Sequence, residues 1–416
     1  MDLVKRIRSA VDVDAVVAMT RDLVSIRSEN PPGRETEIVE HLRGVFAEIG
    51  LEGTAVEPAP GRQNLLVATG DGARSGKPVL LVNGHLDTVP VRASAWRRDP
   101  FGGQVQDGRV YGRGTADMKG GVAAAITALQ VCRSLELDLP CEVAFHLVAD
   151  EELGGAHGTA ALLRKGLIKA DACLDPEPTG LRLCLAECGL MFATVITTGV
   201  PAHGSKPSKG RSAIISAAAI AQVLHDNVFP QVPHPLLGTT TCNVGVIKGG
   251  SGPNVVPEEC ELQIDRRVLP GETLADAERG IVERIASLGL SRGTDYELEV
   301  GTFCEPSEID AAHPFVGFVA RSFSTMTDRA PDTIGLPFTT DARFMRNRLG
   351  IPSVVFGPGE LAVAHTVDEY VEIDALVTAV GVYAHLFANF TGTQPLPNNT
   401  AVSSVDTGVE GAHSVT

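Results

Sequence analysis

The sequence has few of the features that mark nucleic-acid-binding or metal–thiolate proteins. Aromatic residues make up 5% of its 416 residues, tryptophan occurs once, and the eight cysteines form no Cys-x-x-Cys motif. Lysine and arginine number 35 against 51 acidic residues, which gives a formal net charge of −16. An acidic chain without a basic patch binds nucleic acid and anionic membranes poorly, so we expect neither as a partner.

Long apolar runs are also missing. No run of 18 apolar residues occurs, and the first residues, Met1-Asp2-Leu3-Val4-Lys5, lack the apolar core of a signal peptide. Scattered cysteines without a pairing pattern are typical of a reducing compartment. We therefore expect a cytoplasmic protein. The length, with a hydrophobic content of 44%, favours two folded domains.

The stretch from Val79 to Pro90 is the most informative part of the chain. Four apolar residues, Val79-Leu80-Leu81-Val82, predict a buried strand. His85 and Asp87 follow, and residues i and i+2 of an extended chain point the same way. A carboxylate behind an imidazole fixes its tautomer and strengthens it as a metal ligand. The isolated motif is more typical of a capped strand-end histidine, so its interpretation as a metal ligand depends on the rest of the chain.

Acidic residues follow other predicted strands. The strand expected over 143–149 leads to Asp150-Glu151-Glu152, and a short strand leads to Asp175-Pro176-Glu177. Adjacent carboxylates repel one another unless cations lie among them, although a solvated acidic turn is the alternative. Side chains that follow core strands gather at the edge of an open α/β sheet, where ligands bind. We place there His85, Asp87, Asp117, Glu151, Glu152 and Glu177.

The pattern of predicted elements changes near residue 188. Before it, strands alternate with helices, as in an α/β domain. The next segment predicts strand, helix, strand, strand, helix and strand, over 190–198, 212–228, 240–247, 260–264, 274–288 and 296–303. This order is the ferredoxin-like pattern. We therefore predict a mixed-sheet α/β catalytic domain, residues 1–187 and 305–390, interrupted by an inserted α+β lid or dimerisation domain, 188–304. We expect a disordered tail over 391–416.

Five motifs together resemble the M20 family of co-catalytic metallopeptidases, a group that includes acetylornithine deacetylase, succinyl-diaminopimelate desuccinylase, aminoacylase and glutamate carboxypeptidase. The motifs occur in family order, and the resemblance covers roughly residues 10–390. They are Gly84-His85-Leu86-Asp87-Thr88-Val89-Pro90, Gly112-Arg113-Gly114-Thr115-Ala116-Asp117-Met118-Lys119-Gly120-Gly121, Asp150-Glu151-Glu152 with Gly154, Glu177-Pro178-Thr179, and Ala364-His365-Thr366-Val367-Asp368-Glu369.

The resemblance implies two divalent metal ions. Imidazole and carboxylate donors suit zinc, with cobalt or manganese as alternatives. By resemblance, His85 and Glu177 bind one ion, Glu152 and His365 bind the other, and Asp117 bridges the two. Members of the family often have a cis peptide bond directly after the bridging residue.

The resemblance also implies the catalytic roles. Asp87 supports His85, and Glu151 acts as general base toward the attacking water and afterwards as general acid. Asp175 competes with Glu177 as a metal ligand by its chemistry, since the two lie close in sequence. The Glu-Pro-Thr context favours Glu177.

Further predicted residues lie in both domains. The segment Pro201-Ala202-His203-Gly204-Ser205 matches a family segment whose histidine reaches the active site of a dimer partner. We therefore expect a homodimer through the inserted domain, with His203 stabilising the oxyanion. Asn254, Arg267 and Arg343 match positions that hold the substrate, and we add Gly357.

The choice between Arg266 and Arg267 stays open. Either guanidinium can bind a carboxylate. Alternation with Leu262 and Ile264 places Arg266 among the inward residues and Arg267 on the opposite face.

We predict a di-metal amidohydrolase that cleaves the amide bond of an N-acyl amino acid, of the deacetylase or desuccinylase type. The cationic Arg267 and Arg343 suit the free carboxylate of such a small substrate. One alternative is a dipeptidase or carboxypeptidase with the same machinery. A more remote alternative is an inactive binding protein of the same fold.

Overall fold

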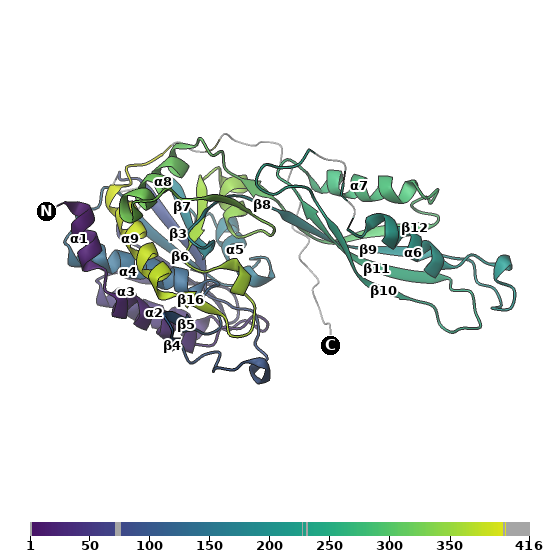
Figure 1. Cartoon of the computed structure of the whole chain (residues 1–416), viewed down its shortest axis with the longest axis horizontal. Coiled ribbons are helices and arrows are strands. Elements are labelled where there is room, and N and C mark those ends of the chain that lie inside the picture. Colours follow the sequence, from purple (N-terminus) through teal and green to yellow (C-terminus); the bar gives the residue numbers. More distant parts are fainter. Residues whose placement is uncertain (1, 71–75, 227, 230–231, 394–395, 397–416) are drawn as a thin grey trace. The chain divides into compact units, whose positions relative to one another are not determined.

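The computed structural model describes the chain except for residues 1, 71–75, 227, 230–231, 394–395 and 397–416 (Figure 1). The chain divides into two compact units. The first unit includes Met1–Leu185, Ile309–Ile334 and the chain from Thr340. The inserted unit includes Ala186–Glu308 and Gly335–Thr339. Most of the tail that we expect to be disordered lies outside the described residues; within it, the Leu396 amide donates to the Gly350 carbonyl (2.8 Å).

A mixed nine-stranded sheet forms the framework of the first unit, and it includes a few residues assigned above to the inserted unit, 186–187, 307–308 and 335–336. Its order is β1 (Gly53–Ala59), β2 (Arg62–Ala68), β6 (Glu142–Val148), β3 (Val79–His85), β7 (Ala172–Pro178), β15 (Ser353–Gly357), β8 (Leu183–Glu187) and β13 (Ser307–Glu308), with β14 (Thr333–Leu336) beside β8. The four central strands, β6, β3, β7 and β15, are parallel. Their carboxyl ends therefore meet at one edge, where open α/β sheets bind ligands.

Helices cover both faces of this sheet, as buried apolar strands require. One face carries α1 (Leu3–Ala10), α2 (Val13–Ser25), α3 (Thr36–Glu48), α4 (Lys119–Ser134), α8 (Pro314–Thr327) and α9 (Ile373–Asn389) (Figure 1). There Phe145 of β6 meets Phe46 of α3 and Phe387 of α9, with ring centroids 5.2 and 6.4 Å away. On the other face, α5 (Thr159–Arg164) and a π-helix (Phe344–Leu349) enclose a second buried cluster.

A small antiparallel sheet combines two neighbouring strands with a third from far along the chain. It consists of β16 (Tyr370–Glu372), β5 (Arg109–Tyr111) and β4 (Gln104–Gln106). Strands of three residues are too short for a visible alternation of polar and apolar side chains. β4 and β5 pair with each other across Asp107-Gly108, and β16 joins them from far away in sequence.

The inserted unit has the predicted ferredoxin-like order. Its elements are β9 (Gly189–Thr198), α6 (Ala213–Leu224), β10 (Cys242–Gly249), β11 (Glu259–Val268), α7 (Leu274–Ala286) and β12 (Tyr296–Cys304). The sheet order is β10-β11-β9-β12 with all neighbours antiparallel. Both helices share one buried core with the sheet. Thr273 caps α7, where it forms a capping box with Asp276.

No helix in the described part of the chain is both long enough and apolar enough to cross a membrane.

Candidate metal centre

Most of the predicted ligands lie at the carboxyl edge of the parallel strands. His85 is the last residue of β3, Glu177 lies near the end of β7, and Glu151 and Glu152 follow β6. Asp117 differs from our expectation that it follows a core strand. It lies instead in the turn before α4, beyond the small sheet, and a cis peptide bond joins it to Met118.

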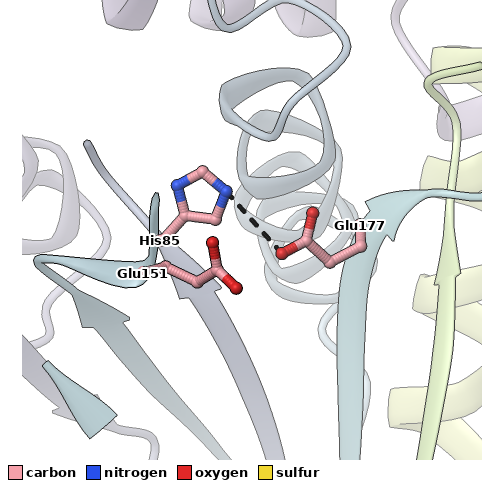
Figure 2. A group of neighbouring side chains, drawn as sticks. All are labelled: His85, Glu151 and Glu177. Atoms are coloured by element: carbon pink, nitrogen blue, oxygen red, sulfur yellow. Dashed lines mark ion pairs between the residues drawn. The ribbon is translucent and has the colours of Figure 1, made fainter. Parts of the chain in front are cut away.

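The predicted ligands form one cluster around Asp117. Its Oδ1 lies 3.0 Å from His85 Nε2, and its Oδ2 lies 3.2 Å from His365 Nε2. His365 Nε2 also lies 3.0 Å from Glu152 Oε2, and His85 Nε2 lies 3.6 Å from Glu177 Oε1 (Figure 2). The two oxygens of one carboxylate thus face two imidazoles, each of which meets a further carboxylate.

Glu151 faces the same space from the acidic turn. One atom each of His85, Glu151 and Glu177 lies within 4.8 Å of the others, and Figure 2 shows the three side chains directed toward one another. Asp175 lies one pleat further down β7, near the Thr340 hydroxyl (3.4 Å). Of the two competing acids, Glu177 is therefore the one whose carboxylate meets His85.

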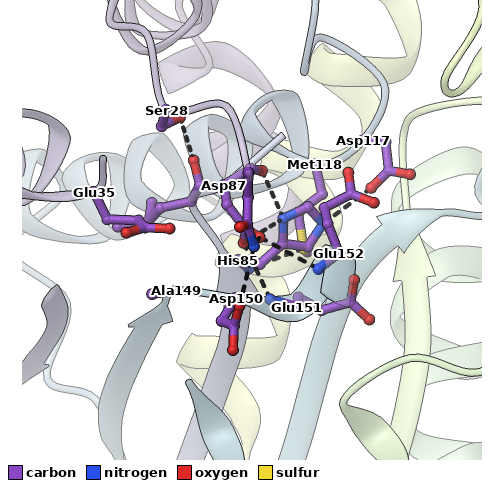
Figure 3. Close-up of polar contacts among 12 residues, drawn as sticks. Ser28, Glu35, His85, Asp87, Asp117, Met118, Ala149, Asp150, Glu151 and Glu152 are labelled. Atoms are coloured by element: carbon purple, nitrogen blue, oxygen red, sulfur yellow. Dashed lines mark hydrogen bonds and ion pairs between the residues drawn. The ribbon is translucent and has the colours of Figure 1, made fainter. Parts of the chain in front are cut away.

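Asp87 joins the strand of His85 to the acidic turn. His85 Nδ1 donates to the carbonyl oxygen of Asp87 (2.9 Å), which leaves Nε2 without a proton and able to bind a metal. We expected the carboxylate in this role, but it lies 3.5 Å from Nδ1. The carboxylate instead accepts the amides of Glu151 (3.2 Å) and Glu152 (3.3 Å) (Figure 3).

The sequence alone did not identify the residues behind Asp87. Asn30 donates to Asp87 Oδ2 (2.8 Å) and to Asp150 Oδ1 (3.1 Å). Arg62 pairs with Glu35 (2.8 Å) and Asp150 (3.1 Å), and all five residues are buried. Asn30 belongs to an Asn-Pro-Pro-Gly turn, which gives no sign of a partner 57 residues away.

The electrostatics of the cluster fit bound cations. Burial raises the pKa of Glu177 well above its usual value, and the charge of Asp117 raises it further. Burial likewise raises the pKa of Glu151. Hydrogen bonds to Asp117 and Glu152 raise the pKa of His365 to about 10. A buried set of carboxylates that needs positive charge, with imidazoles and no thiolate, has the donor chemistry of a zinc, cobalt or manganese site.

Two glycines allow other elements to approach the strand of Glu177. A Cβ atom at Gly121 of α4 would lie 2.1 Å from the Pro176 carbonyl oxygen. One at Gly357 of β15 would lie 2.2 Å from the same atom and 2.4 Å from the Glu177 carbonyl oxygen. Gly357, predicted to bind substrate, thus lies in close backbone contact with a predicted ligand.

Arg343 lies beside the acidic turn. Its Nη1 donates to the Thr340 carbonyl (2.8 Å) and its Nη2 to the Gly154 carbonyl (2.9 Å). The side chain is buried and stacks on the Phe344 ring, 4.2 Å from its centroid. Nη2 of this predicted substrate ligand therefore holds backbone that follows Glu151, whereas Nη1 holds the backbone of its own segment.

The inserted unit brings two of its predicted residues together. Gly204 donates its amide to the Asn254 carbonyl (2.7 Å), and His203 forms a β-bridge with Val255. His203 is exposed, and its Nδ1 accepts the amide of Ser205 (3.1 Å). In a neutral ring this contact places the proton on Nε2, which makes that atom a hydrogen-bond donor.

Arg266 and Arg267 lie on opposite faces of β11, as the alternation predicts. Arg266 is buried, pairs with Glu272 (2.9 Å) and lies 4.0 Å from the centroid of the Phe229 ring. Arg267 is partly exposed, pairs with Asp265 (2.9 Å) and donates to the Pro337 carbonyl (3.1 Å). Arg266 belongs to the packed side of the inserted unit, whereas Arg267 lies on its open side.

Comparison with known proteins identifies the class of this chain. A model of the peptidase family M20/M25/M40 matches residues 81–389. Acetylornithine deacetylase of Salmonella typhimurium is 32% identical over 369 residues, which cover 84% of this chain and 89% of that protein. The protein is thus a metal-dependent hydrolase that acts on amide bonds. In particular, the chain belongs to the M20/M25/M40 peptidase family.

Solved structures confirm the predicted fold. An aminopeptidase of Bacillus cereus superposes with a TM-score of 0.74 at 23% identity, over 91% of this chain and 99% of that one. A tripeptidase of Staphylococcus aureus superposes with a TM-score of 0.73 at 25% identity, over 91% and 98% of the two chains. The mixed α/β sheet and the separate antiparallel sheet of the inserted unit agree with these structures.

Proposed function

We propose that this hydrolase uses two metal ions to cleave the amide bond of an N-acyl amino acid. One observation carries the proposal: the two oxygens of Asp117 face His85 and His365, at 3.0 and 3.2 Å. A carboxylate in this position can be shared between two ions. The similarity to acetylornithine deacetylase supports the substrate class.

The proposed ligands divide into two sets. His85 and Glu177 would hold one ion, Glu152 and His365 the other, and Asp117 would contact both. Zinc is the metal that we favour, with cobalt or manganese as alternatives, because the donors are imidazole nitrogens and carboxylate oxygens. When bound, such ions polarise a carbonyl group and lower the pKa of water.

Glu151 is the proposed proton carrier. Its amide is fixed by Asp87 (3.2 Å), and its carboxyl group faces the space between His85 and Glu177. As general base it accepts a proton from the water that attacks the amide carbonyl. As general acid it then donates that proton to the leaving nitrogen. Its raised pKa suits a group that must hold a proton for part of each cycle.

Further residues would contact the substrate or support the site. Nε2–H of His203 can donate to the developing oxyanion, with Asn254 in the loop beside it. Arg267 is the residue that we favour for the substrate carboxylate, because it is partly exposed on the open face of β11. Arg343 would support the turn that carries Glu151, through the Gly154 carbonyl, and Gly357 would keep β15 close to Glu177.

We also propose a cytoplasmic homodimer that assembles through the inserted unit. Strand β10 lies at an edge of its sheet. Ile247 of β10 is 52% exposed, and Ile215 of α6 is 69% exposed. An edge strand with large apolar side chains nearby is suited to pairing with a second copy. In such a dimer, His203 of one subunit would serve the site of the other.

Metal removal and a substrate panel test the proposal. We expect exhaustive chelation to abolish hydrolysis, and two equivalents of zinc or cobalt per chain to restore it. The panel contains acetyl-, succinyl- and formyl-amino acids together with dipeptides. Full turnover by protein shown to be metal-free would contradict the proposal.

The same panel separates the alternatives. Cleavage of dipeptides but of no acyl-amino acid would identify a dipeptidase or carboxypeptidase. Two bound metals without hydrolysis of any compound would favour an inactive binding protein.

A further inference from the structure

A buried ion pair lies directly behind the candidate metal centre. Arg113 is 4% exposed and Glu369 is fully buried, and Arg113 Nη1 contacts Glu369 Oε2. The two residues belong to segments that pair through β5 and β16, with Val110 opposite Val371. One segment continues to Asp117, and the other begins just after His365.

Glu369 holds the backbone of the bridging carboxylate. Its Oε1 accepts the amide of Ala116 (2.9 Å) and the amide of Asp117 (3.2 Å). The Glu369 carbonyl accepts the amide of Gly112 (2.9 Å). Both peptide units before the Asp117 side chain are therefore fixed by one residue of the other segment.

Arg113 holds the backbone of the second histidine. Its Nη2 donates to the His365 carbonyl (3.4 Å), and its own amide donates to the Pro100 carbonyl (2.7 Å). His365 has a φ of 61°, in the left-handed region that costs energy for a residue with a side chain. A conformation of this kind persists where surrounding contacts maintain it, and the guanidinium of Arg113 provides one.

We propose that Arg113 and Glu369 are a positioning pair. They set Asp117 and His365 at the separation required by the metal ion that Glu152 and His365 would hold. The inference rests on the proposed two-metal function. Neither residue belongs to the proposed ligand set; each acts through the backbone of a proposed ligand. Residues that orient metal ligands typically change metal affinity about 10–100-fold when they are replaced.

The alternative is that the pair merely joins two strands. The chain offers a matched control, because Arg109 and Glu372 form a second ion pair (2.8 Å) between β5 and β16. Their side chains are 37% and 42% exposed. This contact joins the same two strands, and it involves no backbone of Asp117 or His365.

The experiment compares two double variants of the full-length protein. Arg113→Met with Glu369→Gln removes both buried charges together, so that neither is left uncompensated. Arg109→Met with Glu372→Gln is the control. Zinc binding is measured by competition with a chromophoric chelator, and the ligand field of each site by cobalt absorption spectra. Thermal unfolding of the metal-free proteins checks that both variants fold.

We expect the buried double variant to bind one of its two metals about 10–100-fold more weakly, with an altered cobalt spectrum. The other metal, which keeps His85 and Glu177, should weaken less, and the control variant should match the wild type. Unchanged affinity for both metals would overturn the inference, as would equal weakening in the control.

A single variant covers the case in which the double variant does not fold. Arg113→Lys keeps the buried charge opposite Glu369 but lacks the forked group that also reaches the His365 carbonyl. It should weaken the same metal, and a wild-type affinity would contradict the pair's role. If the wild type itself binds fewer than two metals, the proposed function fails, whereas two metals with unaffected variants refute only this inference.

Discussion

The first unit and the inserted unit hold their predicted site residues in different ways. In the first, Asp117 contacts two histidines, and the carboxylate of Asp87 fixes two consecutive amides of the acidic turn. In the inserted unit, His203 and Asn254 are exposed and depend on backbone pairing between two loops. The first arrangement is set in advance by burial and mutual bonding, whereas the second presents donors on a surface.

This difference matches the two tasks of a hydrolase. Ligands for ions must be fixed before the metal binds, since a loose set loses affinity. Groups that contact a substrate need access to solvent, and their contribution appears when the substrate binds or reacts. We therefore expect changes in the first unit to abolish chemistry or metal binding, and changes in the inserted unit to alter turnover or substrate affinity.

The largest effect should come from the acidic turn. Glu151→Gln should keep both metals and lower turnover by roughly 10²–10⁴, because the amide cannot accept the proton of the attacking water. Glu152→Gln should instead lower the occupancy of one metal. Metal analysis and kcat for both variants measure the two effects. If Glu151→Gln lost a metal and Glu152→Gln lost only turnover, Glu152 would be the general base and Glu151 the metal ligand.

The two adjacent arginines allow the packed face and the open face of the inserted unit to be tested separately. Arg266→Met should cost about 3–5 kcal/mol of folding stability, because it leaves Glu272 without its buried partner. Arg267→Met should cost less than about 1 kcal/mol, because its pair with Asp265 is partly exposed. Urea unfolding measures both values, and Arg267→Met should also raise KM for acyl-amino acids. If only Arg266→Met raised KM, the substrate carboxylate would be assigned to Arg266 on the packed face and not to Arg267.

The exposed histidine tests whether the inserted unit serves a second subunit. His203→Ala should lower kcat by roughly 10²–10³ with a smaller change in KM, since its donor acts mainly in the transition state. Mixing His203→Ala with Glu151→Gln subunits should then restore activity, because one site of a mixed dimer has both groups intact. Subunit exchange is verified by mass. Verified exchange without recovered activity would remove the role across the dimer.

The smallest effect concerns a buried polar residue of the first unit outside the candidate site. Burial lowers the pKa of His146 to about 4. Since an unfolded histidine has a pKa near 6.5, the unfolded state binds more protons between these values, and stability falls as pH falls through this window. His146→Leu should reduce that loss by up to about 1.4 kcal/mol per pH unit.

Urea unfolding of metal-free protein at pH 7, 6 and 5 measures this change. Turnover of the His146 variant at pH 7 should match the wild type, because the residue belongs to the framework and not to the chemistry. Parallel stability profiles of the two proteins would contradict the prediction.

Local pattern predicted much of the framework. The apolar run before His85 and the strands before Glu151 and Glu177 placed these residues at one edge, because parallel strands end together. The order of six elements likewise gave the inserted fold.

Contacts between segments that are distant in sequence could not be predicted from the sequence. Arg113 and Glu369 both lie in motifs that resemble the M20 family, yet nothing in either motif indicates that the other residue is its partner. Asn30 and Arg62 behind Asp87 show the same limit, since a hydrogen bond across many residues leaves no local period.

The junction of the two units has a consequence for how such proteins are assembled. Strand β13 pairs antiparallel with β8, and Ser307 lies opposite Glu187. The chain thus enters and leaves the inserted sheet through neighbouring strands. Once that sheet has folded, the two points where it joins the first unit lie side by side. For the first unit, the insert therefore acts as a short connection in place of a long flexible loop. Loop closure then adds little entropy cost when β15 joins β7. An insert of this kind can be lengthened, exchanged or removed while the parallel strands of the first unit stay in register.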